Sequence, residues 1–340
     1  MMPLYKILFM ITLATGTLIS ISSNSWLGVW MGLEMNLLSF IPLMNDSSNP
    51  RSTEASLKYF IVQALASIIL LMGMLTDTIN SDLPSNLLTS NLPFLCITTA
   101  LVIKTGAAPT HFWFPEVMEG LSWLNATLLL TWQKIAPMIT LTYTSMNENF
   151  LTFLIIMSVI VGGLMGLSQT SMRKILSYSS INHIGWMLAA LFFTETLWTW
   201  YFSIYSMMNS VITWALSKFN ISSVSQMMVM SKLYPQLKIF LMFNLFSLGG
   251  IPPFIGFLPK WLTVQTMISK EMYFTTCLMI VITLVTLYFY MRIAMPSLSL
   301  TTSNKSLIYS KIYSKSKKML ILNSALLMSL AASTLTFNWI

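Results

Sequence analysis

Four ionisable residues lie inside stretches that are otherwise apolar: Glu34, Lys104, Lys134 and Lys260. An ionised side chain at the centre of a membrane helix costs about 2.5–3.5 kcal/mol, so the four together would cost about 10 kcal/mol if they faced lipid. Burial disfavours the charged form of a lysine, and a nearby carboxylate favours it. A buried lysine whose carboxylate partner approaches or retreats can therefore bind and release a proton. A row of such residues predicts a proton relay.

Three of these residues also have a structural interpretation. Glu34 can be a buried partner that only fixes one lysine, and Lys260, which follows Pro259, can lie at the membrane interface. Lys134 can extend its ammonium group to the membrane surface, although the run LLLTWQ before it and IAP after it favour a deep position. These alternatives stay open on the sequence.

Other chemistries lack the residues that they need. The sequence has no glycine-rich phosphate loop and no dinucleotide fingerprint, and it contains two cysteines and two histidines. Cys96 and Cys277 lie far apart in apolar stretches without a C-x-x-C pattern. They therefore predict no disulfide, zinc site or iron–sulfur cluster, and we expect no cofactor in this chain.

The composition indicates that a membrane surrounds these residues. Of the 340 residues, 55% are hydrophobic and 8% are charged, and the mean hydropathy is +0.72. Soluble domains carry roughly 25% charged residues, so a cytosolic enzyme, a secreted scaffold and a disordered chain are excluded. Eleven stretches approach the length of about 20 apolar residues that spans a bilayer. They are residues 4–22, 25–44, 56–75, 92–108, 121–143, 150–168, 173–193, 198–217, 237–260, 272–292 and 318–338.

Charges between these spans predict an orientation, because basic residues concentrate on the cytoplasmic or matrix side of a membrane. With eleven spans, fourteen basic residues fall on the N-terminal side and only Lys270 falls on the other, with five acidic residues. The net charge of +8 is therefore a topology signal, and we expect no nucleic-acid partner. Glu116 and Glu119 lie on the basic side, where surface ion pairs with neighbouring basic loops are expected.

Two spans are interrupted by glycine and proline, one just after Lys104 and one shortly before Lys260. The helix-breaking residues are Gly106, Pro109, Gly249, Gly250, Pro252 and Pro253. Proline removes a backbone donor and glycine loosens the turn. The freed carbonyl groups are tolerated at membrane depth only against protein or a water-filled cavity.

The two breaks share a pattern with an offset of 144 residues. The matching positions are Gly106, Pro109, Pro115 and Glu116, then Gly250, Pro253, Pro259 and Lys260. The breaks lie in the fourth and ninth spans, so they must run in opposite directions. Paired broken helices in inverted repeats are typical of ion-coupled transporters.

This pattern predicts an all-α polytopic membrane protein of about eleven transmembrane helices, with two inverted five-helix repeats. The predicted parts are a first repeat (1–145), a second repeat (146–292), a basic matrix-side connection (293–317) and a C-terminal helix (318–340). Lysines between 305 and 318 recur at roughly helical spacing. They fit an interfacial helix on anionic lipid as well as they fit a solvated loop.

Several longer motifs carry a resemblance to one family. They include Gly32-Leu-Glu34-Met-Asn36, Lys104-Thr-Gly-Ala-Ala-Pro109, His111-Phe-Trp-Phe-Pro-Glu116, Leu130-Thr-Trp-Gln-Lys134-Ile-Ala-Pro137, Ser179-Ser-Ile-Asn-His183-Ile-Gly-Trp186 and Ser247-Leu-Gly-Gly-Ile-Pro-Pro-Phe254. The chain closely resembles the mitochondrial NADH dehydrogenase subunit 2 family (NADH-ubiquinone oxidoreductase chain 2), in the short animal form that lacks three N-terminal helices. The resemblance runs along most of the chain but leaves out residues 293–317.

The resemblance implies an antiporter-like subunit in the membrane arm of respiratory complex I, the proton-translocating NADH:ubiquinone reductase. It implies that Glu34 pairs with Lys104, and that Lys134 is the central relay. It also implies that His183 lies between Lys134 and Lys260, and that Lys260 ends the half-channel.

The resemblance further implies a place and partners for the chain. The expected location is the mitochondrial inner membrane, with the N-terminus in the matrix and the C-terminus in the intermembrane space. The expected partners are other membrane-arm subunits, including neighbouring antiporter-like ones, and phospholipid, with cardiolipin as the expected species. FMN, iron–sulfur clusters and ubiquinone are expected elsewhere in the complex, with no redox centre in this chain.

Two other functions stay open on the sequence. An independent cation/proton antiporter of the same fold would work without a redox partner and would show sodium-dependent flux in liposomes. A structural scaffold would need Lys104 and Lys134 for assembly but not for pumping. The main hypothesis is the proton-translocating subunit.

Overall fold

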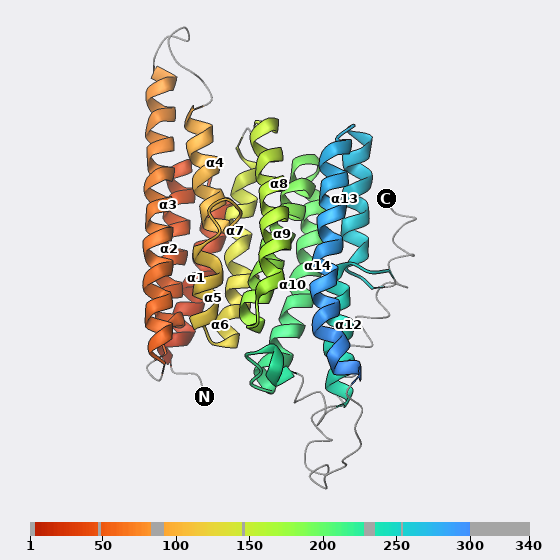
Figure 1. The fold of residues 1–340 in the computed structure, drawn as a ribbon. Coiled ribbons are helices and arrows are strands. Elements are labelled where there is room, and N and C mark those ends of the chain that lie inside the picture. Colours follow the sequence, from red (N-terminus) through yellow and green to blue (C-terminus); the bar gives the residue numbers. More distant parts are fainter. Residues whose placement is uncertain are drawn as a thin grey trace. The chain divides into compact units, whose positions relative to one another are not determined.

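The computed structural model describes residues 4–46, 49–82, 92–144, 147–227, 235–252 and 254–299. This part of the chain is helical, with thirteen α-helices of defined bounds, one short 3-10 helix and no β-strand beyond an isolated bridge between Ser171 and Ser223 (Figure 1). The all-α prediction is confirmed for these residues. The predicted C-terminal helix (318–340), most of the 293–317 connection and Pro253 lie outside them.

Five helices in the described part are long and apolar enough to cross a membrane. They are α1 (Leu4–Ser22), α2 (Trp26–Met44), α3 (Pro50–Asp82), α8 (Glu148–Met165) and α14 (Tyr273–Ser299). Two further helices reach spanning length with more polar sequences: α9 (Met172–Phe193) and α10 (Glu195–Lys218). The 3-10 helix η1 (Gly166–Ser168) follows α8 directly.

Short helices replace continuous spans at three places. The first pair is α4 (Leu92–Thr105) and α5 (Trp113–Gly120), and another is α12 (Pro235–Gly249) and α13 (Phe257–Ser269). Of these, α5 lies between the predicted spans 92–108 and 121–143. Residues 121–143 were expected to form one helix, but they form α6 (Trp123–Leu130) and α7 (Trp132–Thr142).

The interruption between α6 and α7 has a local physical cause. Thr131 leaves helical geometry with φ −115° and ψ −72°, and its hydroxyl donates to the carbonyl of Thr127 at 2.7 Å. Pro137 cannot donate to the carbonyl of Gln133, and its ring crowds that turn. The next helix, α7, begins at Trp132, two residues before Lys134.

The chain divides into two compact units. The first unit comprises Met1–Ser158 with Leu176–Gly185, and the second comprises Val159–Ile175 with Trp186–Ile340. Helices α8 and α9 contribute residues to both units.

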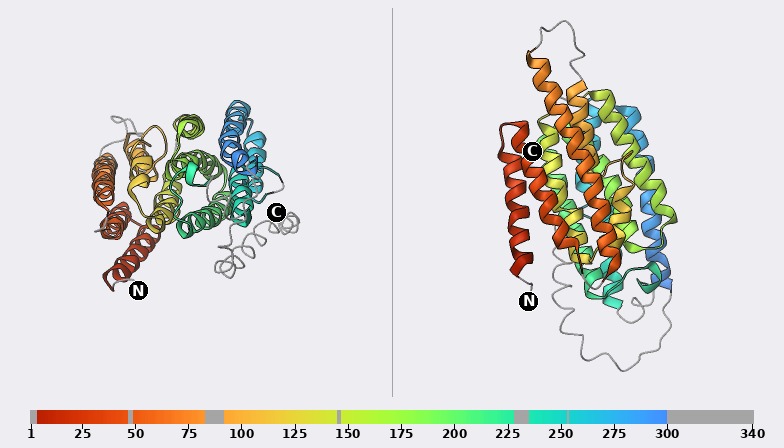
Figure 2. Two further views of the ribbon diagram at one scale, coloured as in Figure 1. Left: turned by 60° about the horizontal axis from the view of Figure 1, so that its bottom comes forward. Right: turned by 90° about the vertical axis from the view of Figure 1, so that its left-hand side faces the viewer.

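In the first unit, α3 packs against α2, α4 and α5, and α7 contacts α1, α2, α4 and α6. Helices α1 and α2 run side by side, as the red helices of Figure 2 show. Their backbones approach so closely that a Cβ added to Gly32 would lie 2.8 Å from the carbonyl oxygen of Gly16. Small residues thus bring this helix pair together, as is common between membrane helices.

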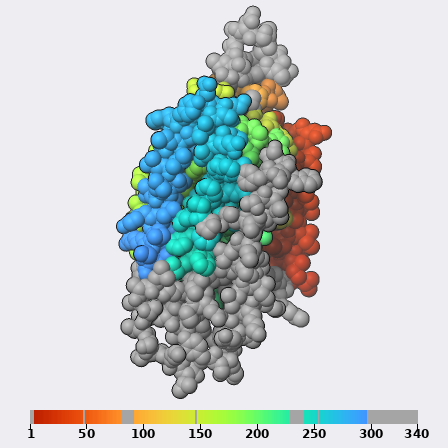
Figure 3. Space-filling model, turned by 90° about the vertical axis from the view of Figure 1, so that its right-hand side faces the viewer, coloured from red at the N-terminus to blue at the C-terminus, as the bar shows by residue number. Residues whose placement is uncertain are grey.

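In the second unit, α10 packs against α12 and α13, and α14 packs against α12, α13 and η1. Helices α13 and α14 are visible on one face of this unit in Figure 3, in cyan and blue. The outer side of α14 exposes large apolar residues such as Phe274, Leu284 and Tyr288, whereas Phe289 and Tyr290 are buried. An apolar outer face suits a helix that is surrounded by lipid.

Candidate functional site

The first helix break follows Lys104, which lies in the last turn of α4 and is 6% exposed. Gly106 adopts φ +76°, a left-handed conformation that glycine takes at little steric cost. Its N–H lies 3.1 Å from the carbonyl of Ile103, and the N–H of Ala107 donates to Val102 at 3.3 Å. These are the two bonds of a Schellman motif, which ends a helix by satisfying its last carbonyl groups.

The second helix break repeats this backbone arrangement 144 residues later. Gly250 adopts φ +79°, and its N–H lies 3.0 Å from the carbonyl of Ser247. The N–H of Ile251 donates to Phe246 at 3.3 Å. The shared sequence pattern therefore corresponds to a shared local geometry.

Lys260 binds the end of the helix that precedes its own. Its ammonium group donates to the carbonyl of Leu248 at 3.2 Å and to that of Gly249 at 2.9 Å, the last residues of α12. These carbonyls lack intrahelical partners, and a positive charge is favourable at a helix C-terminus. Lys260 is 7% exposed and lies 5.9 Å from the centre of the Trp186 ring. Lys260 is therefore buried within the second unit, and its depth in the membrane stays a prediction.

Lys104 and Lys134 line one cavity in the first unit. Lys134 lies on α7, is 1% exposed, and has its ammonium group 5.5 Å from the centre of the Phe114 ring. The centre of a water molecule can move within about 20 Å³ of this cavity, and one water needs roughly 10–15 Å³ on that measure. Its lining residues are Leu33, Asn36, Leu37, Tyr59, Gln63, Lys104, Thr105, Trp113, Phe114, Leu129, Gln133, Lys134 and Pro137.

Neutral polar side chains that the sequence analysis missed also line this cavity. The Oδ1 of Asn36 and the Nε2 of Gln133 are buried and have no hydrogen-bond partner within the protein. The hydroxyl of Tyr59 donates to the Oε1 of Gln133 at 3.4 Å, and Gln63 donates to the carbonyl of Lys104 at 3.5 Å. Buried polar atoms of this kind are normally satisfied by ordered water. The arrangement can therefore hold a water molecule between polar groups and two lysines.

Glu34 is half-buried on α2, close to Lys104 but not in contact with it. Its Oε1 is buried without a hydrogen-bond partner, and its charge acts on Lys104 and Tyr59. Both Glu34 and Lys104 are described, and no ion pair within 4.0 Å joins them. The pairing of Glu34 with Lys104 therefore stays a prediction.

The two histidines are both buried. His183 lies on α9 and is 2% exposed, and the neighbouring Asn182 has an Oδ1 without a partner. The Nδ1 of His111 lies 3.1 Å from the carbonyl oxygen of Pro109, and its ring packs against Phe112. His183 belongs to the first unit and Lys260 to the second, so a connection between them stays a prediction.

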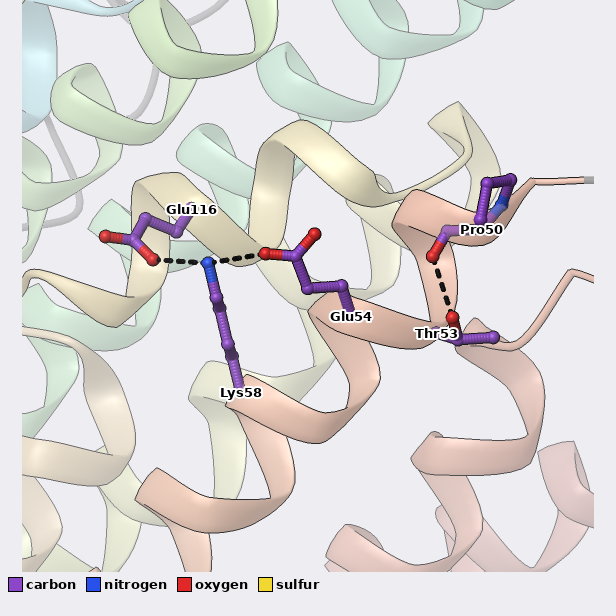
Figure 4. A network of polar contacts seen from close by, with 5 residues as sticks. All are labelled: Pro50, Thr53, Glu54, Lys58 and Glu116. Atoms are coloured by element: carbon purple, nitrogen blue, oxygen red, sulfur yellow. Dashed lines mark hydrogen bonds and ion pairs between the residues drawn. The ribbon is translucent and has the colours of Figure 1, made fainter.

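A surface network lies at the start of α3. The ammonium group of Lys58 binds Glu54 at 3.0 Å and Glu116 at 2.9 Å, and the hydroxyl of Thr53 donates to the carbonyl of Pro50 (Figure 4). Glu116 therefore forms a surface ion pair as expected, but its basic partner lies on helix α3 and not in a loop. Glu116 occupies the position that matches Lys260 in the repeat pattern, but it is exposed.

Across the described ranges, no group of three or more histidine, cysteine, aspartate or glutamate side chains is arranged to hold a metal ion. The candidate site contains lysines, a carboxylate, amides and a phenol. These groups can bind, release and pass on protons.

Comparisons with known proteins place the chain in a family. A family described as NADH:quinone oxidoreductase/Mrp antiporter, TM matches residues 23–286. The NADH-ubiquinone oxidoreductase chain 2 of Anopheles gambiae is 49% identical over 290 residues, which cover 84% of either chain. The protein of that name from Aedes aegypti is 46% identical over 333 residues, or 97% of either chain.

The fold is also that of a solved structure. A chain of respiratory complex I from Thermus thermophilus with bound Aureothin matches with a TM-score of 0.85 at 23% sequence identity. The match covers 98% of this chain and 79% of that one. All five predicted relay residues lie within the region that the family matches. The chain therefore belongs to the NADH-ubiquinone oxidoreductase chain 2 family, the antiporter-like membrane subunits of respiratory complex I.

Proposed function

We propose that the chain moves protons across the mitochondrial inner membrane as a membrane-arm subunit of respiratory complex I. The driving force would be electron transfer from NADH to ubiquinone, which takes place in other subunits that hold FMN and iron–sulfur clusters. The observation that carries the proposal is the cavity shared by Lys104 and Lys134, since it is large enough for water and lined by unsatisfied polar atoms.

The proposed mechanism uses changes in the protonation of the buried lysines. When the carboxylate of Glu34 approaches Lys104, it favours the ammonium form, and when it retreats, the ammonium group loses a proton to the cavity. In this structure no ion pair joins the two groups. Water held by Asn36 and Gln133 would then pass that proton to Lys134.

The later part of the path follows from the family resemblance. Protons would pass from Lys134 through His183 and water to Lys260, which ends the half-channel. The fold would comprise eleven transmembrane helices in two inverted five-helix repeats and one further C-terminal helix. The N-terminus would face the matrix and the C-terminus the intermembrane space, with other membrane-arm subunits and cardiolipin around the chain.

The direct test is the change Lys134→Met in the assembled complex. We expect proton pumping per NADH oxidised to be lost, because methionine keeps the bulk of the side chain but cannot bind a proton. The matched control is Lys270→Met, since Lys270 is exposed at the end of α13 and should leave the ratio unchanged. Normal assembly with full pumping in Lys134→Met would contradict the proposal.

A second candidate function is cation/proton exchange. The observation behind it is that the description of the matching family names an Mrp antiporter. It predicts sodium-dependent proton flux when the purified complex in liposomes is not supplied with NADH. Proton pumping that depends on NADH and is indifferent to sodium would favour the complex I function.

A further inference from the structure

A row of buried polar side chains follows α10 through the second unit. Tyr201, Tyr205, Asn209 and Thr213 recur every four residues, and each is at most 1% exposed. Twelve residues of α-helix span about 18 Å, which is more than half of the roughly 30 Å hydrocarbon core of a membrane. So long a polar row is unexpected in a helix that needs only apolar packing.

A third tyrosine joins this row from another helix. Tyr290 lies on α14 and is 2% exposed. Tyr201 interacts electrostatically with both Tyr205 and Tyr290, so the three phenol groups lie near one another inside the second unit. A phenol can donate and accept a hydrogen bond at the same time.

The tyrosines lie beside the second helix break. A Cβ added to Gly249 would be 3.5 Å from the Cδ2 of Tyr290, and the carbonyl of Gly249 accepts the bond from Lys260. On α10, the Sδ of Met208 accepts a hydrogen bond from Ser247 at 3.3 Å, one residue before Asn209. Helix α10, which carries the polar row, therefore packs against α12 close to the end that Lys260 binds.

Buried atoms along the row lack protein partners. They are the Oδ1 of Asn209, the Nε1 of Trp198, which precedes Tyr201 by one helical turn, and the Nε1 of Trp186, whose ring faces Lys260. Two donors and one acceptor without partners, in a region rich in hydroxyl groups, indicate sites for ordered water.

We infer that Tyr201, Tyr205, Tyr290 and Asn209 form, with water, a proton-carrying segment that leads from Lys260 along α10 toward its N-terminal end at Glu195. The inference rests on the proposed function and extends it by naming the path beyond Lys260. Glu195 is exposed at the start of α10, on the side that the sequence predicts to be acidic.

The transfer conserves protons at every step. Each hydroxyl or water accepts a proton from its neighbour on the Lys260 side and donates its own proton to the next group. The phenols are neutral before and after the transfer. The net change is one proton moved from the ammonium group of Lys260 to water near Glu195, which leaves Lys260 as a neutral amine.

The test replaces tyrosine by phenylalanine, which removes the hydroxyl and keeps the ring. Complexes carrying Tyr201→Phe, Tyr205→Phe and Tyr290→Phe, singly and together, are compared for protons pumped per NADH oxidised and for the effect of D₂O on that ratio. Tyr288→Phe is the matched control, because Tyr288 lies on the same helix as Tyr290 and is 62% exposed. We expect the triple variant to lose pumping as fully as Lys260→Met, with the control unchanged.

A purely structural role would give a different result, since lost packing lowers the amount of assembled complex without changing protons per NADH. Full pumping per assembled complex in every variant would therefore overturn the inference. If the triple variant does not assemble, protons pumped per NADH oxidised are measured in the single variants and in Asn209→Leu, and the same criterion applies to them. Should Lys134→Met and Lys260→Met stop pumping while the tyrosine variants pump fully, the inference falls and the proposed function stands. Should the lysine variants also pump fully, both fall.

Discussion

The two helix breaks end in the same backbone turn but differ in the groups that satisfy the end of the helix. At the first break, neutral donors serve the carbonyls of α4: the Nε1 of Trp113 binds Ile103 at 3.2 Å, and Gln63 binds Lys104. At the second break, the ammonium group of Lys260 serves the carbonyls of α12.

In the first unit, the helix end is therefore held without a charged side chain. In the second unit, a charged lysine holds it. The matching residue at the first break, Glu116, is exposed and pairs with Lys58, so it takes no part in ending the helix. Lys260 both holds the helix end and is a candidate proton carrier. A change in its charge therefore changes the bonds at the end of α12.

The largest expected effect comes from removing Lys260. In Lys260→Met, the carbonyls of Leu248 and Gly249 stay buried without a donor, so we expect a loss of about 1–3 kcal/mol of stability together with the loss of pumping. At the first break, Trp113→Phe removes one neutral hydrogen bond and should cost about 0.5–1.5 kcal/mol. Thermal inactivation of the two assembled complexes measures the difference, and equal losses would break the comparison.

A smaller difference is expected between Gly250→Ala and Gly106→Ala. Both changes place alanine in a left-handed conformation, at about 1–2 kcal/mol each. A Cβ at position 250 would lie 2.8 Å from the Cδ and 3.1 Å from the Nζ of Lys260, whereas at position 106 it would meet the ring of Phe114 at 3.2 Å. Pumping per NADH should therefore fall further in Gly250→Ala. Equal pumping per NADH in the two variants would show that proton pumping does not depend on the observed position of Lys260.

The smallest effect is expected at the surface network of Lys58. Glu116→Gln and Lys58→Met remove an exposed ion pair, which contributes little because water and salt screen it. We expect unchanged pumping per NADH, and the double variant should match either single one. Loss of pumping as large as in Lys260→Met would mean that the two matching positions are functionally equivalent.

The sequence was sufficient to predict the features that depend on local residue types. Glycine and proline act on their own turn, so the interruptions after Lys104 and before Lys260 follow from a short stretch of sequence. The low charge content predicted a membrane protein, because it follows from residue types alone and needs no knowledge of contacts. The motifs around Glu34 and Lys134 also indicated the family that the comparisons confirm.

Features that depend on distant contacts escaped prediction. Tyr59 and Gln133 form a hydrogen bond although 74 residues separate them in the sequence. Nothing in their residue types tells a cavity-lining position from an ordinary contact between two helices. The tyrosines of α10 counted as part of an apolar span, because a phenol ring is mostly hydrophobic. The interruption at Thr131 was missed because its hydroxyl bonds the carbonyl of Thr127, and a threonine does not by itself mark the end of a helix.

The most direct measurement of the central claim is a structure of the assembled complex at a resolution that shows ordered water. We expect a water molecule in the cavity between Lys104 and Lys134, within hydrogen-bond distance of the Oδ1 of Asn36 and the Nε2 of Gln133. A dry cavity, with both lysines bound only to protein groups that keep them apart, would contradict it.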